Sequence, residues 1–319
     1  MLSRVAEEIY WMGRYRERAE NVARLLEVNL HLSADAPAEM GNQWIPMVQT
    51  MGDEESFEKK YGEEYDEANV INFLAFDRDN PSSMYSSLSG SRANARMVRE
   101  IITSEMWQEI NTVYLHVKKM ASDRSASHTY YEFFSRIKRQ CQLFTGITET
   151  TMLRNEAWQF ARMGNLLERA DMISRTLDVK YFMLLPSPDH VGTPYDNIQW
   201  MALLKSASAF EMYRKKWRQV NPVHVVGFLM LDPEFPRSIY SCIIRALDAL
   251  RIISKDEPGN PEDHPLKKMT ALKRQLETVT SSDVIRLGLH EFIDTIQTEI
   301  AEIHEAVTEK YFVLWTADE

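Results

Sequence analysis

The stretch MGRYRERAENVARLLEV at residues 12–28 decides the fold of this chain, because it returns downstream as MGNLLERADMISRTLDV at 163–179. The two segments share the pattern MGxxxERA[ED]x[VI][AS]RxL[ED]V at an offset of 151 residues. Apolar residues recur at three- and four-residue steps in the first copy, which is typical of an amphipathic helix. We therefore expect a long helix in each copy, with the charged motif at the same place in both.

Two further blocks repeat in the same order. WIPMVQTMGDEESFEKKY (44–61) parallels WMALLKSASAFEMYRKKW (200–217) at an offset of 156, and FLAFDRDNPSSMYS (73–86) parallels FLMLDPEFPRSIYS (228–241) at 155. Nearly constant offsets predict a tandem duplication with halves of about 1–150 and 151–319. Duplicated halves often pack like the subunits of an isologous dimer. We expect one helical bundle whose halves are related by a pseudo-two-fold axis.

The rest of the chain also favours helices, since strand-type alternation is nearly absent. The predicted fold class is all-α, in one domain over 1–319. The pair Asn80-Pro81 predicts a helix start, with Asn80 as the N-cap and Pro81 at the first helical position. Beyond the two motif helices, helices are expected from Trp44 and over 81–103, 105–120, 128–150, 198–219, 236–254, 266–280 and 282–313, with the second motif helix at 152–182. Loops are expected at 33–43, 186–197 and 256–265.

Composition excludes several functional classes. The net charge is −10 without a basic domain, which argues against nucleic-acid binding. Cys141 and Cys242 are far apart, so neither a disulfide framework nor a zinc site is expected. No signal peptide or membrane-spanning stretch is recognisable, and we expect a cytoplasmic protein. Dispersed histidines and the lack of phosphate-loop, dinucleotide or nucleophile-elbow motifs predict no metal and no cofactor.

The charged helix has two interpretations. Its carboxylates and last arginine share one face in each copy, and the arginine after the first glutamate lies about 100° away. These residues are Glu17, Arg18, Glu20 and Arg24 in the first copy, and Glu168, Arg169, Asp171 and Arg175 in the second. They could lock the repeats through buried ion pairs, or line a cavity that clamps a carboxylate or phosphate. Arg14 and Arg16 are not repeated, and we expect them to be surface charges.

The FLxxDxxxPxS block suggests an anion site at a helix start. Asp77 and Asp232 end an apolar run, and Ser83 and Ser238 fall in the first turn that follows, where free N–H groups favour an anion. Ordinary N-terminal capping is the alternative. Nearby positive charge for an anionic ligand comes from Arg92, Arg96, Arg99 and Arg237.

A glycine stands at the same place in both motif helices. Gly13 and Gly164 each cost about 1 kcal/mol relative to alanine inside a helix. Their presence in both copies predicts that another backbone, or a ligand, approaches closely there.

These blocks resemble the bacterial alpha-E family, an all-helical domain named for its Glu-Arg motif. The resemblance runs in family order through LSRVAEEIYWMGRYRERAENVARLL (2–26), FDRDNPSSMYSSLSGSRANARMVREIITSEMWQEIN (76–111), FTGITETTMLRNEAWQFARMGNLLERADMISRTLDVKY (144–181) and FPRSIYSCI (235–243). Ala93 departs from it, because the family more often has an acidic residue there. If that acidic residue serves chemistry in the family, its absence counts against this helix as a catalytic element.

The resemblance implies association with circularly permuted ATP-grasp proteins and transglutaminase-like peptidases, and so ATP-dependent amide or peptide-bond formation. One hypothesis is an enzyme or half-site binding an anionic amino acid or peptide, with Glu17, Arg18, Glu168 and Arg169 as candidate catalytic residues. The candidate substrate-binding residues are then Glu20, Arg24, Asp77, Ser83, Arg92, Arg96, Asp171, Arg175, Asp232, Arg237 and Ser238. The other hypothesis is that the chain is a non-catalytic docking partner of the ligase, with the Glu-Arg motifs as structural locks.

Overall fold

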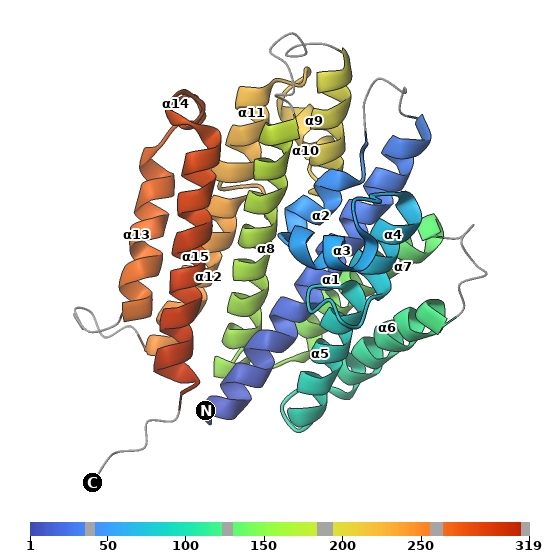
Figure 1. Ribbon diagram of the computed structural model, residues 1–319. Helices are drawn as coiled ribbons and strands as arrows, with labels where there is room; N and C mark the ends of the chain where they lie inside the picture. The colour runs from blue at the N-terminus through green and yellow to red at the C-terminus, as the bar shows by residue number, and fades with distance from the viewer. Residues whose placement is uncertain (36–41, 123–129, 184–193, 256–263, 314–319) are drawn as a thin grey trace.

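The computed structural model describes the chain except residues 36–41, 123–129, 184–193, 256–263 and 314–319. The described residues form fifteen α-helices and two short π-helices, with no β-strand among them (Figure 1). The all-α prediction is confirmed.

Two long helices form the centre of the molecule. They are α1 (Ser3–Asp35) and α8 (Glu156–Met183), the two helices that carry the repeated motif. They pack against each other more extensively than any other pair of elements, and Figure 1 shows them crossing in the middle of the bundle. Their apolar stripes are buried, with Ile9, Leu26 and Leu167 fully inaccessible. Burial of this stripe is what the helical periodicity predicts.

A set of three helices packs beside each central helix (Figure 1). The set beside α1 is α5 (Met84–Met97), α6 (Ser104–Ser122) and α7 (Tyr130–Thr151). The set beside α8 is α12 (Ile239–Ser254), α13 (His264–Thr278) and α15 (Leu289–Tyr311). The bundle therefore consists of two similar groups joined at the α1–α8 crossing.

Short helices complete the fold. They are α2 (Ile45–Met51), α3 (Glu54–Tyr61), α4 (Glu67–Ile71), α9 (Pro194–Ser206), α10 (Phe210–Lys216), α11 (Pro222–Val226) and α14 (Ser281–Leu287). The π-helices η2 (Asn72–Phe76) and η5 (Gly227–Leu231) each lead into a capping aspartate. α2 packs against α8, and α9 packs against both α1 and α8.

Several predicted helix boundaries are wrong. The helix expected over 198–219 is divided by Ser208, whose φ of 51° is left-handed, and that over 282–313 is divided at Gly288, with φ 114°. α5 begins after Ser83 rather than at Asn80, because the Ser83 hydroxyl accepts from the Ser86 N–H at 3.1 Å. Most of the three predicted loops lies outside the described residues, and their ends belong to α1, α9 and α13.

Candidate functional site

α1 and α8 approach each other closely at their matched glycines. A Cβ atom at Gly13 would lie 2.5 Å from the Ala161 carbonyl oxygen, and one at Gly164 would meet the Tyr10 carbonyl oxygen at least as closely. Tyr10 and Ala161 also match at the 151-residue offset, so the contact is reciprocal. The close approach predicted at these glycines is to backbone, and it sets the distance between the two charged motifs.

One turn beyond the glycines, each glutamate pairs with the other helix's arginine. Arg169 donates to Glu17 from Nε (2.7 Å) and Nη2 (2.8 Å), and Arg18 donates to Glu168 from Nε (2.6 Å) and Nη2 (3.2 Å). Both glutamates are completely buried. Bidentate pairs of this kind fix geometry in both partners. We call the two arrangements the Glu17 cluster and the Glu168 cluster.

Both carboxylates are ionised. Burial by itself would raise the pKa of Glu17, but Arg169 and Arg237 hold it well below the usual value. The pKa of Glu168 is also lowered, because Arg14 and Arg18 outweigh the effect of burial. A carboxylate with a lowered pKa and no access to solvent is a poor general base.

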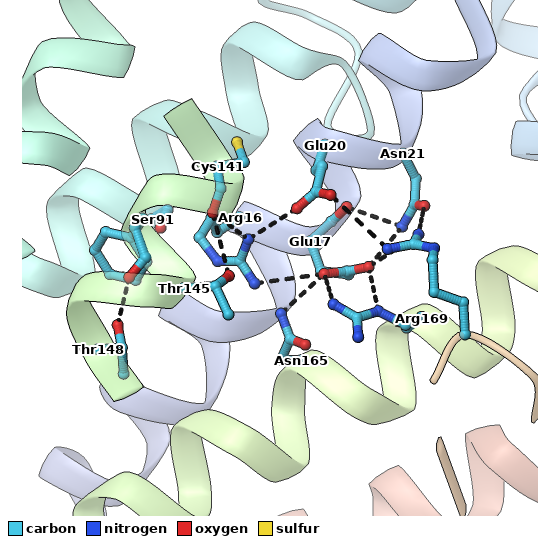
Figure 2. A network of polar contacts seen from close by, with 12 residues as sticks. Arg16, Glu17, Glu20, Asn21, Ser91, Cys141, Thr145, Thr148, Asn165 and Arg169 are labelled. Carbon is cyan, nitrogen blue, oxygen red and sulfur yellow. Dashed lines mark hydrogen bonds and ion pairs between the residues drawn. The ribbon is translucent and has the colours of Figure 1, made fainter. Parts of the chain in front are cut away.

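The Glu17 cluster has an excess of positive charge (Figure 2). Glu17 also accepts from Asn165 Nδ2 at 2.9 Å and lies near Arg16 (3.4 Å) and Arg237 (3.2 Å). The second carboxylate, Glu20, pairs with Arg16 and Arg24. Arg24 also contacts Ser208, at the break between α9 and α10. Four arginines thus face two carboxylates in a mostly buried region.

Arg237 is the least compensated of these arginines. Its Nη2 donates to Asn21 Oδ1 at 2.6 Å, but its buried Nε has no hydrogen-bond partner among the described residues. The side chain is 9% exposed, and burial lowers its pKa to about 10. Ser82 stands at the matched position of the other half. Arg237 was expected to supply charge for an anion at the helix start after Asp232, and the structure places its side chain in the Glu17 cluster.

The Glu168 cluster is balanced. Its arginines are Arg14, Arg18 and Arg175, and its carboxylates are Glu168, Asp171 and the half-buried Asp53. Arg175 Nε donates to Asp171 at 2.8 Å, and burial raises the pKa of Asp53.

The prediction that Arg14 and Arg16 are surface charges is wrong. Arg14 is 8% exposed and its Nε donates to Glu168 at 2.8 Å. Arg16 is 3% exposed, and its Nη1 donates to Glu20 (3.0 Å) and to the Cys141 carbonyl on α7 (3.1 Å). A comparison of repeats finds only what both copies share. The signal for Arg14 was its position four residues before Arg18, on the same helix face.

A cavity of about 80 Å³ adjoins the Glu17 cluster. It lies among α1, α7, α8 and α12, and Arg16, Asn165 and Arg169 connect it to the cluster. The other lining residues are Met12, Gly13, Phe144, Thr145, Thr148, Glu149, Trp158, Ala161, Arg162, Leu166 and Arg245. Figure 2 shows Thr145 and Thr148 on the side of the cluster where Arg16 and Asn165 lie. Sequence reasoning missed Arg162 and Arg245, which belong to no shared motif.

The remaining predicted site residues have contacts outside both clusters. Asp77 pairs with Lys60 (2.8 Å) and Asp232 with Lys216 (2.6 Å). The Ser83 and Ser238 hydroxyls donate to the Asp77 and Asp232 carbonyls and cap α5 and α12, as the capping alternative describes. Arg92 donates to Asn111 at 2.7 Å, and Arg96 is exposed.

Within the described ranges, no three His, Cys, Asp or Glu side chains gather closely enough to hold a metal ion. Cys141 and Cys242 are both buried and free. The same ranges include no helix with the length and apolar character needed to cross a membrane.

Comparison with known proteins places the chain among uncharacterised relatives. It is 26% identical to an uncharacterised protein of Mycobacterium bovis and to uncharacterised proteins of two Mycobacterium tuberculosis strains, each over 336 aligned residues. The alignments cover 96% of this chain but only 36% of each relative, so the chain spans about a third of their length. No solved structure gives a significant match. Residues 1–312 match the Alpha-E family, described as a predicted alpha-helical domain with a conserved ER motif, and the chain belongs to this family.

Proposed function

We propose that this chain is the substrate-binding component of an amide- or peptide-bond-forming system linked to an ATP-grasp enzyme. It holds an anionic amino acid or peptide in the cavity beside the Glu17 cluster. The observation that carries the proposal is the charge of this cluster, where four arginines face two carboxylates next to an open cavity. Uncompensated buried charge is costly, and a bound anion would offset it.

In this proposal the glutamates position the site and do not transfer protons. Glu17 and Glu168 are saturated by arginine donors and have lowered pKa values, so neither is suited to deprotonate an amine. Arg18 and Arg169 complete the crossed pairs that keep α1 and α8 in register. These four residues, considered above as catalytic candidates, therefore act as a lock that fixes the arginines around the cavity.

We further propose that the fold arose by tandem duplication and that its halves are related by a pseudo-two-fold axis. The reciprocal Glu–Arg pairs support this, as do the Lys60–Asp77 and Lys216–Asp232 pairs at offsets of 156 and 155 residues. On this view the cavity lies between the halves, with α7 contributed by the first and α12 by the second.

The partner in this proposal is a circularly permuted ATP-grasp protein, with a transglutaminase-like peptidase as a further associate. The support is the family resemblance. The length of the relatives agrees with it, because nearly two thirds of each lies outside the aligned region and is long enough for additional domains.

The second candidate function is a docking scaffold without a substrate of its own. The reciprocal bidentate Glu–Arg pairs between α1 and α8 favour it, because a lock of this kind needs no ligand.

The test measures ADP formation by a purified circularly permuted ATP-grasp partner with amino acids and short peptides, with and without this chain. Calorimetry of the same substrates with the chain alone accompanies it. The proposal expects the chain to raise ADP formation and to bind the active substrate by itself. A chain that raises ADP formation but binds no substrate is a scaffold. A chain that does neither has a different function.

A further inference from the structure

Two arginines of the cavity make no direct ion pair with any described residue, although one carboxylate, Glu149, also lines it. Arg162 on α8 and Arg245 on α12 both line it, and within the described part of the chain neither guanidinium makes a hydrogen bond or an ion pair. Arg162 lies over the Trp158 ring, 5.1 Å from its centroid. The acidic side chains that act on Arg162 pair with other arginines, Glu149 with Arg154 at 3.6 Å and Asp248 with Arg251 at 3.8 Å.

The two guanidinium groups repel each other in partly buried surroundings. Burial and the charge of Arg245 lower the pKa of Arg162, although Glu149 and Asp248 act in the opposite sense. Like charges without a direct ion-pair partner are unfavourable in partly buried surroundings, and arginine binds anions through bidentate hydrogen bonds. Trp158 holds the Arg162 side chain in place by a cation–π contact.

The matched place in the other half is filled. Trp11 stands at the position of Arg162 and Gly90 at that of Arg245, by the offsets of 151 and 155 residues. The Tyr15 ring occupies the space above Gly90, where a Cβ atom would lie 3.0 Å from Tyr15 Cε2, and Tyr15 stacks on Trp11 at 5.1 Å. The bundle tolerates aromatic packing at this location. The arginines on the cavity side are therefore not required by the packing of the central helices.

We infer that Arg162 and Arg245 are a specificity-determining pair that binds a phosphoryl group in this cavity. The inference rests on the proposed function only in placing the substrate here. A phosphoryl group carries between one and two negative charges at neutral pH, whereas a carboxylate carries one. The cavity is lined by two arginines without ion-pair partners in the described ranges and by one carboxylate, Glu149, and it adjoins a cluster with two surplus positive charges, so the more highly charged group suits it better. Arginine also recognises phosphate through bidentate hydrogen bonds.

The size of the cavity agrees with a single such group. Its volume of about 80 Å³ has room for several water-sized atoms, by comparison with the 10–15 Å³ that one water needs. A phosphate group, counted with its ester oxygen, has five heavy atoms, while a nucleotide is far larger. The ligand is therefore the phosphorylated end of a substrate, or free phosphate, with the rest of the molecule outside the cavity.

The experiment compares inorganic phosphate with acetate, by calorimetry in a low-salt buffer free of both. The proteins are wild type, Arg162→Gln, Arg245→Gln and the control Arg136→Gln, which removes an exposed arginine of α7 that does not line the cavity. Circular dichroism checks the fold of each variant. We expect wild type and the control to bind phosphate at least tenfold more tightly than acetate. Each cavity variant should bind phosphate at least tenfold more weakly than wild type.

Three results overturn the inference. Unchanged phosphate binding in both folded cavity variants would move the site elsewhere, and acetate binding as tight as phosphate would remove the phosphoryl preference. No phosphate binding by wild type would also end it. None of these results decides the proposed function, which depends on ADP formation with the ATP-grasp partner. If both cavity variants lose their fold, phosphate protection of Arg162 and Arg245 from phenylglyoxal in wild type provides the test, and no protection contradicts the inference.

Discussion

The Glu17 and Glu168 clusters contain the same bidentate Glu–Arg pair in surroundings of different charge. Both lie one turn beyond a matched glycine, and both glutamates are completely buried. Around Glu17 there are four arginines and two carboxylates, whereas around Glu168 there are three of each. The shared residues therefore form the lock between α1 and α8, and the unshared residues decide what each side can bind.

Four substitutions between matched positions account for this difference: three favour positive charge around Glu17, and one, Arg14 in place of Asn165, adds a positive charge around Glu168. Arg16 stands where the second copy has Leu167, and Arg237 stands where the first has Ser82. The third is Asp53, which is matched by Ala209 on the Glu17 side and so adds a negative charge only near Glu168. The reciprocal Glu–Arg pairs fix the geometry on both sides, but only the Glu17 side has surplus positive charge.

The largest effect is expected from removing each buried carboxylate. Glu17→Gln leaves Arg16, Arg169 and Arg237 without their shared counterion and should cost about 3–5 kcal/mol of unfolding free energy. Glu168→Gln should cost less, because Arg18 is 19% exposed and can turn toward water. Urea denaturation at pH 7 measures both. Equal losses would mean that the charge difference between the clusters has no energetic consequence.

Substitution of each matched glycine by alanine tests the close approach of α1 and α8, which the two clusters share. Gly13→Ala and Gly164→Ala place Cβ against the Ala161 and Tyr10 carbonyl oxygens and should each cost about 1–3 kcal/mol, despite the better helix propensity of alanine. Thermal unfolding monitored by circular dichroism measures the losses, with Gly146→Ala as control because its Cβ has no neighbour within 4 Å. A loss in only one of the two variants would contradict a reciprocal crossing.

The sequence was sufficient to predict the fold class and to single out the repeated Glu-Arg residues, although it left open whether they form buried pairs or line a cavity. Helical periodicity is a local property, and a residue that both copies keep at one offset is held by the same contact in each. The glycines belonged to this shared set and were correctly linked to a close approach. Residues outside it, such as Arg16 and Arg245, could not be placed, because their burial depends on which helix packs against them.

The positions at which predicted helices are interrupted were harder to predict from the sequence, for a different reason. Gly288 offered a signal, since glycine adopts positive φ easily, but Ser208 did not, because serine rarely does. Ser208 takes this conformation where Gly52 (φ 73°) ends α2 at the matched position, and Arg24 contacts it there. The tertiary contact, and not the local sequence, accounts for the end of α9.

Acid should weaken the Glu168 side through a histidine that packs beside it. His304 on α15 has its Nδ1 3.1 Å from the Tyr10 hydroxyl, and burial together with Arg14 lowers its pKa to about 4. The unfolded chain binds this proton near pH 6.5, so the stability from neutral His304 is complete above that pH and is lost toward pH 4. We expect a loss of about 1–2 kcal/mol over this interval.

Urea denaturation between pH 7 and pH 4 measures this dependence in wild type and in His304→Gln. The variant cannot take up the proton and should show a shallower decline than wild type. Arg14, Arg18 and Glu168 all face the imidazole, and their charges are kept in the variant. Parallel curves for the two proteins would show that His304 is not responsible.

The smallest effect is expected from removing a surplus charge. Arg237→Met brings the Glu17 cluster closer to neutrality and relieves a buried guanidinium whose pKa is already lowered to about 10. Glu17 keeps Arg16 and Arg169, so the net loss should stay within about 1 kcal/mol. Arg14→Met serves as the comparison in the Glu168 cluster. It takes this balanced cluster away from neutrality and should cost about 2 kcal/mol or more. A larger loss for Arg237→Met than for Arg14→Met would show that the fourth arginine is required for the lock, and the surplus charge would no longer mark this side as the one kept for an anion.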